Sequence, residues 1–363
     1  MMVNFTGNSA TISGGAVSAV GSNITFHGSS IVTFSNNSAE DGGAVRVELR
    51  LLSTRGYPVM SYDENSTVTF TGNSATNDGG ALSSVHSHID FKGNSTVMFY
   101  NNSAQEGGAV YIGSHYSYDP FEVIFQGITN VTFIRNTATV GGALYLYYCD
   151  IVIKGNAVAD FYNNKALLNG GASSLVNSYI WFTGGSTVYF NNNIAAQDGG
   201  AISSVINAKI AADETCSVTF TRNTALQQGG ALYLFYRSAM VFGGSSNITY
   251  SNNTALQQGG AVYFALQSQV RFKGNSVTVF QHNSVILSGG ALYSFSNDPI
   301  YFEENCTVSF YRNMVRRDGG AAYSVNTTLY FSGSSSVFFT SNAAMQQGGA
   351  ICLFYKAAAM FSR

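Results

Sequence analysis

The chain has 363 residues, of which 45% are hydrophobic and only 10% are charged, so amides, hydroxyls and backbone groups must supply most of its polar surface. A formal net charge of -2 creates no long-range field toward nucleic acid or anionic lipid, which excludes proteins that bind either by charge. No apolar run approaches the ~20 residues that cross a bilayer, so no transmembrane segment is expected.

The first residues, MMVNFTGNSATISGG, already contain a copy of a motif that recurs along the chain. They have neither a basic segment nor an apolar core, so they do not form a signal peptide. Because the chain starts inside this motif, we expect a single repeat domain, residues 1–363, from a longer protein and without its end caps.

The triplet Gly-Gly-Ala occurs twelve times, at intervals that are mostly 28 to 30 residues, and an aromatic-x-x-Asn motif precedes each copy. Every copy contains three short stretches of alternating polarity, such as GGALYLF, AMVF and NITY after Gly229. Three strands and three corners in about 30 residues describe one coil of a parallel β-helix, whereas a propeller blade needs four strands and about 40 residues. We therefore predict an all-β solenoid of about twelve coils, with three strands per coil.

Equivalent residues of successive coils should lie about 4.8 Å apart and form columns along the solenoid. Phe34, Phe70 and Phe99 would then belong to an internal aromatic column, and Gly-Gly would supply positive φ where the chain turns into the next strand. The recurring asparagines should form an amide ladder at one corner, in which each side chain bonds its neighbours above and below. These ladder residues are Asn37, Asn73, Asn102, Asn136, Asn223 and Asn253.

Carboxylates stand immediately before Gly-Gly in three successive coils, at Asp41, Asp78 and Glu106. Stacked about 4.8 Å apart they would repel one another unless they held a cation, and Ca²⁺ prefers such oxygen ligands. The alternative is that the three side chains are solvated and bind nothing, and no other cofactor is expected. No column of lysine or arginine accompanies them, which weakens a polysaccharide lyase interpretation.

Two coils are longer than the others, and both insertions fall at the same corner. The insertions, residues 46–59 and 111–121, hold much of the chain's concentrated Arg, Tyr and His. Insertions on one face of a solenoid often form its binding face. Candidate ligand contacts are therefore Arg55, Tyr57, His115, Tyr116 and Tyr118, and the alternative is that both segments are tolerated surface loops.

Tyrosines occupy the second residue after Gly-Gly-Ala in four successive coils, at Tyr233, Tyr263, Tyr293 and Tyr323. If flanking residues such as Leu232 and Leu234 face inward, these rings face outward and suit contact with protein or glycan. The alternative is a structural ladder.

The paired motifs Gly-Gly-Ala-[Ile/Leu/Val] and Phe-x-x-Asn resemble the repeats of the chlamydial polymorphic outer membrane proteins, as in FSNNSAEDGGAV (residues 34–45) and FTGNSATNDGGAL (residues 70–82). The resemblance covers nearly the whole chain. It implies an autotransporter- or adhesin-like, right-handed parallel β-helix of the pectin-lyase-like type, displayed at the cell surface. The chain departs from the family pattern at both ends, so the resemblance does not imply how the chain is anchored.

Together these features predict a non-enzymatic extracellular or cell-surface protein, associated with the outer membrane if bacterial. It would act as an adhesin or stalk whose partner is a protein or glycan of another cell or of the matrix. A polysaccharide lyase or hydrolase on the same scaffold and a surface coat without a specific ligand are the alternatives. The cysteines, Cys149, Cys216, Cys306 and Cys352, lie too many coils apart for a disulfide, which needs Cα atoms within about 7 Å.

Overall fold

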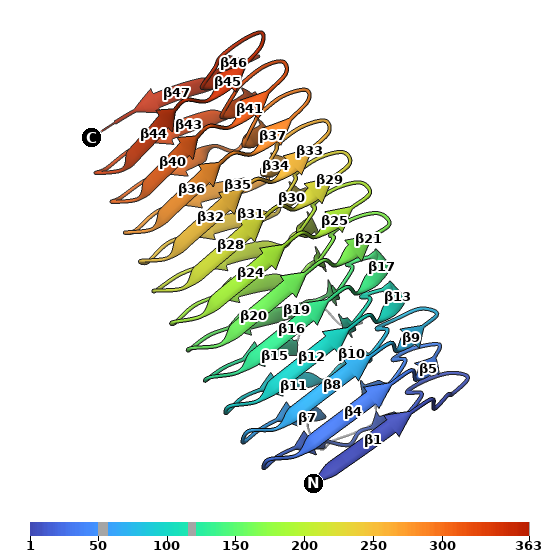
Figure 1. The fold of residues 1–363 in the computed structure, drawn as a ribbon. Coiled ribbons are helices and arrows are strands. Elements are labelled where there is room, and N and C mark those ends of the chain that lie inside the picture. Colours follow the sequence, from blue (N-terminus) through green and yellow to red (C-terminus); the bar gives the residue numbers. More distant parts are fainter. Residues whose placement is uncertain (50–56, 115–120, 363) are drawn as a thin grey trace.

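The chain forms a rod of stacked coils, with the N-terminus at one end and the C-terminus at the other (Figure 1). The structure is a computed structural model and describes residues 1–49, 57–114 and 121–362. Every regular element in these ranges is a β-strand, and the strands pair in parallel within four long sheets. The predicted all-β parallel solenoid of about twelve coils is therefore confirmed.

Sheet I is built from the strands whose second-to-last residue is the aromatic of the aromatic-x-x-Asn motif. Its twelve strands follow one another in chain order along the rod. They are β1 (Met2–Thr6), β4 (Ile31–Ser35), β8 (Thr67–Thr71), β12 (Thr96–Tyr100), β16 (Asn130–Ile134), β20 (Val158–Tyr162), β24 (Thr187–Asn191), β28 (Ser217–Thr221), β32 (Asn247–Ser251), β36 (Val277–Gln281), β40 (Thr307–Tyr311) and β44 (Ser336–Thr340).

Sheet II is built from the strands that follow Gly-Gly-Ala, and it also has twelve members. They are β2 (Val17–Val20), β6 (Val45–Glu48), β10 (Leu82–Val85), β14 (Val110–Gly113), β18 (Leu144–Tyr147), β22 (Ser173–Val176), β26 (Ile202–Ile206), β30 (Leu232–Phe235), β34 (Val262–Ala265), β38 (Leu292–Phe295), β42 (Ala322–Val325) and β46 (Ile351–Phe354).

Sheet III completes the triangle, and its twelve strands lead back to sheet I. They are β3 (Ile24–Phe26), β7 (Val59–Tyr62), β11 (His88–Phe91), β15 (Phe121–Phe125), β19 (Cys149–Ile153), β23 (Tyr179–Phe182), β27 (Lys209–Ala212), β31 (Ala239–Phe242), β35 (Gln269–Phe272), β39 (Ile300–Phe302), β43 (Thr328–Phe331) and β47 (Ala358–Phe361).

Sheet IV lies between the asparagine corner and Gly-Gly-Ala, where the sequence predicted only a corner. Its eleven strands are mostly two residues long, so a coil contains three long strands and one short strand. They are β5 (Ser38–Ala39), β9 (Ser74–Ala75), β13 (Ser103–Glu106), β17 (Thr137–Val140), β21 (Lys165–Ala166), β25 (Ile194–Ala195), β29 (Thr224–Ala225), β33 (Thr254–Ala255), β37 (Ser284–Val285), β41 (Met314–Val315) and β45 (Ala343–Ala344).

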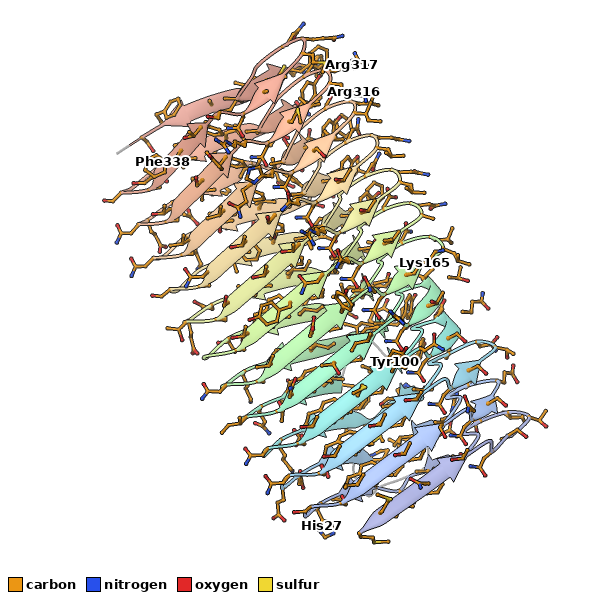
Figure 2. The ribbon with its side chains drawn as sticks, in the orientation of Figure 1. His27, Tyr100, Lys165, Arg316, Arg317 and Phe338 are labelled. Carbon is orange, nitrogen blue, oxygen red and sulfur yellow. The ribbon has the colours of Figure 1, made fainter. Side chains whose placement is uncertain are left out.

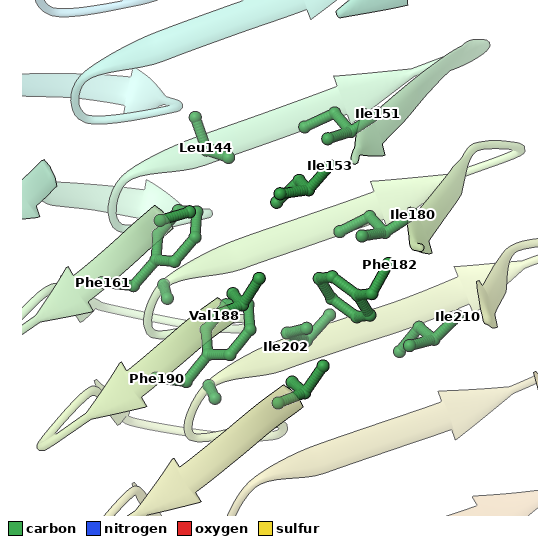
Figure 3. Close-up of a cluster of buried hydrophobic side chains, with 14 of the residues drawn as sticks. Leu144, Ile151, Ile153, Phe161, Ile180, Phe182, Val188, Phe190, Ile202 and Ile210 are labelled. Carbon is green, nitrogen blue, oxygen red and sulfur yellow. The ribbon is translucent and has the colours of Figure 1, made fainter. Parts of the chain in front are cut away.

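The core is a continuous column of apolar side chains between sheets I, II and III (Figure 3). On sheet I, neighbouring rings stack with centroids 4.7–4.9 Å apart and planes within 2–6° of parallel, from Phe5 to Phe339. Phe182 of sheet III meets Phe190 of sheet I edge-on, with centroids 6.4 Å apart. Because a single coil cannot bury its own side chains, this core exists only through stacking.

The asparagine corner between sheets I and IV is a buried hydrogen-bond ladder. Asn73 donates from both its backbone N–H and Nδ2 to Oδ1 of Asn102, each at 3.0 Å, and Nδ2 also donates to the carbonyl of Phe34. The same contacts recur from Asn37 to Asn313, and include all six asparagines that the sequence predicts for the ladder.

The two glycines of Gly-Gly-Ala have different roles. Gly229 has φ of 64°, which L-residues other than Asn and Asp adopt at a cost. A Cβ on Gly230 would lie 2.1 Å from the carbonyl oxygen of Gly260 in the next coil. The prediction that the pair supplies positive φ therefore holds for the first glycine, while the second allows two coils to approach closely.

The outer faces carry polar, charged and isolated aromatic side chains, as Figure 2 shows for Tyr100 and Phe338 on sheet I and for Arg316 and Arg317 beside sheet IV. The four cysteines are free and buried. Cys216 and Cys306 lie at equivalent places that Ser246 and Ser276 occupy in the coils between them. Within the described residues, no helix is long and apolar enough to cross a membrane.

Candidate ligand-binding corner

The two insertions lie at the corner between sheets II and III, which we call the II–III corner. Residues 49–58 connect β6 to β7 and residues 114–120 connect β14 to β15, whereas residues 86–87 are enough between β10 and β11. Of the residues proposed for this corner, Tyr57 is described. Arg55, His115, Tyr116 and Tyr118 lie outside the described residues.

Tyr57 belongs to a cluster of rings where the two long connections rejoin sheet III. Its ring meets Phe121 edge-on, with centroids 4.8 Å apart, and lies 5.8 Å from the ring of His88. The rings of His86 and His88 are each 5.6 Å from Phe121. Phe121 is buried and Tyr57 is 39% exposed, so the cluster has an anchored base and an accessible edge.

The histidines of this cluster serve packing and backbone contacts. His88 Nδ1 accepts a hydrogen bond from the backbone N–H of Glu122 at 3.3 Å. Within the part of the chain that the structure describes, no three His, Cys, Asp or Glu side chains are arranged to hold a metal ion. The cluster is therefore suited to contact with an organic group or a protein surface.

A second exposed apolar stretch lies on the same corner toward the C-terminal end. Tyr236, Leu266 and Phe295 are 39%, 40% and 45% exposed, and they line a hollow of about 440 Å³ together with Arg237 and Asn326. The guanidinium of Arg237 lies 5.2 Å from the centroid of the Tyr236 ring, and its Nε donates to Oε1 of Gln267. The repeat pattern did not predict this hollow, whose signal in the sequence is a bulky residue at the end of the sheet II strand or directly after it.

The backbone at this hollow is in an unfavourable conformation. Leu266 and Gln267 have φ of 52° and 63°, and Tyr236 and Arg237 have 45° and 59°. At the equivalent bends of other coils the left-handed residue is Gly21, Asn177, Asn207 or Asn326, which adopt such angles more readily, whereas His86, Tyr148 and Tyr355 carry the same strain in three further coils. Bulky residues are thus kept here at a conformational cost, a pattern that often marks a functional surface.

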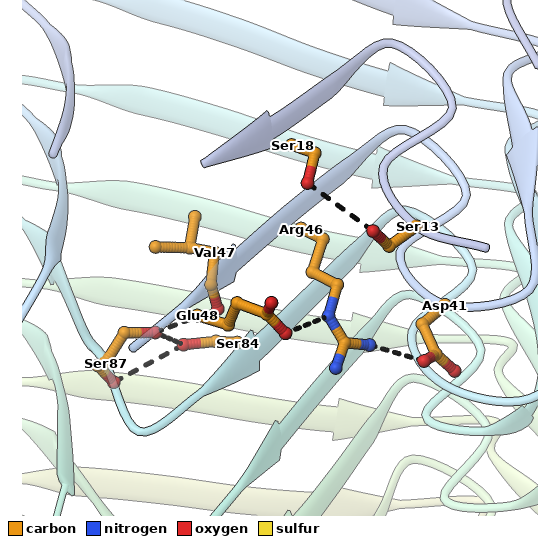
Figure 4. Close-up of polar contacts among 8 residues, drawn as sticks. All are labelled: Ser13, Ser18, Asp41, Arg46, Val47, Glu48, Ser84 and Ser87. Carbon is orange, nitrogen blue, oxygen red and sulfur yellow. Dashed lines mark hydrogen bonds and ion pairs between the residues drawn. The ribbon is translucent and has the colours of Figure 1, made fainter. Parts of the chain in front are cut away.

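The first of the three carboxylates before Gly-Gly, Asp41, lies close to Arg46 of sheet II (Figure 4). Arg46, the second residue after Gly-Gly-Ala, forms ion pairs with Asp41 and with Glu48. Burial, followed by the charges of Asp41 and Glu106, raises the pKa of Asp78 to about 7, and burial also raises the pKa of Glu106.

Arg46 places a positive charge beside Asp41, one of the three carboxylates for which Ca²⁺ or solvation were the predicted alternatives. This single arginine is not a column of lysine or arginine, and it lies beside Asp41 because the residue before Gly-Gly folds back beside the second residue after Gly-Gly-Ala. Since the described side chains do not form a metal-binding group, Asp41, Asp78 and Glu106 carry no metal proposal.

The four tyrosines after Gly-Gly-Ala stack on the outer face of sheet II. Centroids are 5.2 Å apart for Tyr233–Tyr263 and Tyr263–Tyr293, and 5.5 Å apart for Tyr293–Tyr323. Tyr263 and Tyr293 are only 7% and 8% exposed, and burial, then Tyr323, raises the pKa of Tyr293 to about 12. The column therefore offers a ligand little area.

Comparison with protein families identifies the repeat. Five segments match the Chlamydia polymorphic membrane protein repeat, at residues 3–20, 31–48, 67–85, 187–205 and 217–234. The segment 31–48 contains β4, β5 and β6, so the matched unit is a sheet I strand, the asparagine corner, the short strand, Gly-Gly-Ala and a sheet II strand. The resemblance drawn from the two motifs is confirmed. No curated protein and no solved structure matches the chain.

Proposed function

We propose that this protein is a non-enzymatic, adhesin-like β-helix that binds a protein or glycan of another cell or of the matrix through its II–III corner. Its repeats, which match those of polymorphic membrane proteins, support association with an outer membrane or cell surface. The observation that carries the proposal is the accessible aromatic and apolar surface at two stretches of this one corner, around Tyr57 and around Tyr236.

The corner has the composition of a protein-binding surface. Tyrosine, phenylalanine and arginine are enriched in the centres of interfaces, where rigid rings and a guanidinium give much contact area at little entropic cost. Tyr236, Phe295 and Arg237 form such a group around the hollow, and Asn326 supplies a polar edge. A hydrolase or lyase has less support, because Arg46 already pairs with Asp41 and no column of lysine or arginine stands beside Asp78 and Glu106.

The test is attachment by folded variants. One variant replaces residues 49–58 with a connection as short as residues 86–87, and a second carries Tyr236→Ser and Phe295→Ser. We expect each to keep the parent's circular dichroism spectrum and to lose about tenfold or more in attachment to cells or matrix, because central aromatic residues dominate binding energy.

The matched control is Leu226→Ser with Leu256→Ser, which removes two apolar side chains of similar exposure, 45% and 41%, beside sheet IV. This control should attach like the parent. If both corner variants remain folded and attach as well as the parent, the II–III corner is not the binding surface.

A further inference from the structure

The outer face of sheet III contains a hollow of about 380 Å³ that is separate from the II–III corner. It is lined by Trp181, Lys209, Ala211, Val241, Gly243 and Lys273, with Thr183, Asp213 and Glu214 at its edge. Trp181 is 45% exposed and is the only tryptophan in the chain. Nothing in the repeat pattern requires a large, exposed ring at this place.

The hollow exists because, in two neighbouring columns of outward-facing residues, short side chains stand next to long ones. In one column Trp181 is followed in the next two coils by Ala211 and Val241. In the other, Gly243 stands between Asp213 and Lys273, and a Cβ on Gly243 would lie 3.2 Å from Cε of Lys273. The side chain of Lys273 therefore occupies the space that a side chain on Gly243 would fill. The floor of the hollow lies between this lysine at one end and the indole of Trp181 at the other.

Two ammonium groups at the hollow are not neutralised by carboxylates. Nζ of Lys209 lies 5.5 Å from the centroid of the Trp181 ring. Within the part of the chain that the structure describes, neither Lys209 nor Lys273 forms an ion pair, while the neighbouring Arg271 is bound to Glu303.

The two carboxylates at the edge stand in the turn that follows β27 and accept backbone N–H groups of this turn and of the equivalent turn in the preceding coil. Asp213 Oδ1 accepts the backbone N–H of Glu214 at 2.8 Å, and Glu214 Oε2 accepts the backbone N–H of Gly184 at 2.7 Å. An entering ligand therefore meets a flat apolar ring, two ammonium groups and carboxylate oxygens that backbone N–H groups hold in place.

We propose that this hollow binds an acidic saccharide, a glycan whose sugar ring carries a carboxylate. The C–H face of a sugar ring packs on an exposed indole, because the indole offers a large apolar face while the sugar hydroxyls stay in contact with water. The carboxylate would accept charge-assisted hydrogen bonds from Lys209 and Lys273. Sugar hydroxyls would donate to Asp213. A neutral apolar ligand would leave both lysines without a charged partner.

The experiment uses the single tryptophan as the reporter. The probe is a tetrasaccharide of alternating glucuronate and N-acetylglucosamine, and its counterpart is the same tetrasaccharide with the carboxylates reduced to alcohols. Titration of the full chain with the acidic probe should give a saturable change in tryptophan fluorescence, with a Kd on the order of 1 mM or tighter. The reduced counterpart should bind about tenfold more weakly, since it lacks the charge that the lysines recognise.

Three variants test where the saccharide binds. Binding to the variant without tryptophan is measured by calorimetry, because this variant has no fluorescent reporter. Trp181→Ala should abolish binding, and Lys209→Gln with Lys273→Gln should bind both tetrasaccharides equally weakly. Tyr179→Ala is the control, because Tyr179 lies on the same strand with 39% exposure but does not line the hollow.

No response to the acidic probe at tens of millimolar, equal binding of the two tetrasaccharides by the parent, or an equal loss in Tyr179→Ala would each overturn the proposal. These outcomes are independent of the II–III corner, because attachment variants at that corner leave the hollow intact. Retained saccharide binding with lost cell attachment would therefore separate the two surfaces.

Discussion

At the scale of single residues, the stability of this solenoid depends on side chains that bond to the coils above and below. Asn223 donates through Nδ2 to Asn253 Oδ1 and to the carbonyl of Phe190, at 3.0 and 2.8 Å. Its own Oδ1 accepts the backbone N–H and Nδ2 of Asn193, both at 3.0 Å. One buried amide thus satisfies polar groups in two other coils, which explains why no other residue type replaces asparagine there.

Removal of one ladder amide should therefore be costly. Asn223→Ala leaves the backbone N–H of Asn193 buried without a partner, and we expect a loss of about 1–3 kcal/mol in the free energy of unfolding. Asn342→Ala is the control, because Asn342 ends the ladder and is exposed enough for water to replace its bonds. Urea denaturation of both variants measures the difference. Equal midpoints for Asn223→Ala and the parent would show that the ladder does not stabilise the fold.

At the scale of the elements, the three long strands of a coil follow from the sequence, and the fourth does not. Alternating polarity over four or five residues identifies strands of sheets I, II and III. The strands of sheet IV, such as β29 (Thr224–Ala225), are too short to show any alternation, and they form because the corners on either side hold them in register. The corners also differ in sequence: the residue that bends the chain between sheets II and III is a glycine at Gly21 and a leucine at Leu266.

We expect Leu266 to lower the free energy of unfolding while it provides an exposed apolar surface. Its φ of 52° is unfavourable for a leucine, so Leu266→Gly should raise the free energy of unfolding by about 1 kcal/mol. The same change removes one wall of the hollow at Tyr236, so attachment should fall. Thermal melts and the attachment assay measure the two effects.

Gly21→Ala provides the converse control for the bend. Gly21 has φ of 57°, and a Cβ there meets no atom within 4 Å, so this substitution tests backbone strain alone and should lower stability. If Leu266→Gly were less stable than the parent, the apolar contacts of Leu266 would outweigh the strain of its backbone.

At the scale of the whole molecule, the period of the sequence determines the stacking, and stacking determines most of the fold. Equivalent residues recur every 28 to 30 residues, so the Phe34 column and the Asn37 ladder could be predicted without coordinates. The hollow at Trp181 could not, because it depends on which small residues share a column across three coils. The ion pairs of Arg46 were missed for a similar reason, since they depend on how the chain folds back at Gly-Gly.

Three carboxylates on the outside of the rod give the whole molecule a pH dependence. Burial is the largest cause in each case: it raises the pKa of Asp78 to about 7 and the pKa values of Asp150 and Asp198 to about 6. Ordinary aspartate pKa values in an unfolded chain are about 3.9. Between these values the folded chain binds more protons than the unfolded chain, so the free energy of unfolding decreases as the pH rises through this window.

We therefore expect the melting temperature to be higher at pH 5 than at pH 8, with most of the change between pH 5 and 7. In the triple variant Asp78→Asn, Asp150→Asn and Asp198→Asn the profile should be flatter, and at pH 8 this variant should melt above the parent, because neutral amides need no desolvation of charge. Asparagine keeps the oxygen that accepts the backbone N–H of Tyr179 at position 150 and of Gln228 at position 198, so these two hydrogen bonds survive the substitution. Differential scanning calorimetry in buffers of matched ionic strength measures both profiles. A parent melting temperature that increases from pH 5 to pH 8 would show that these carboxylates are ionised in the folded state without cost, and that Asp78, Asp150 and Asp198 are less buried than the structure indicates.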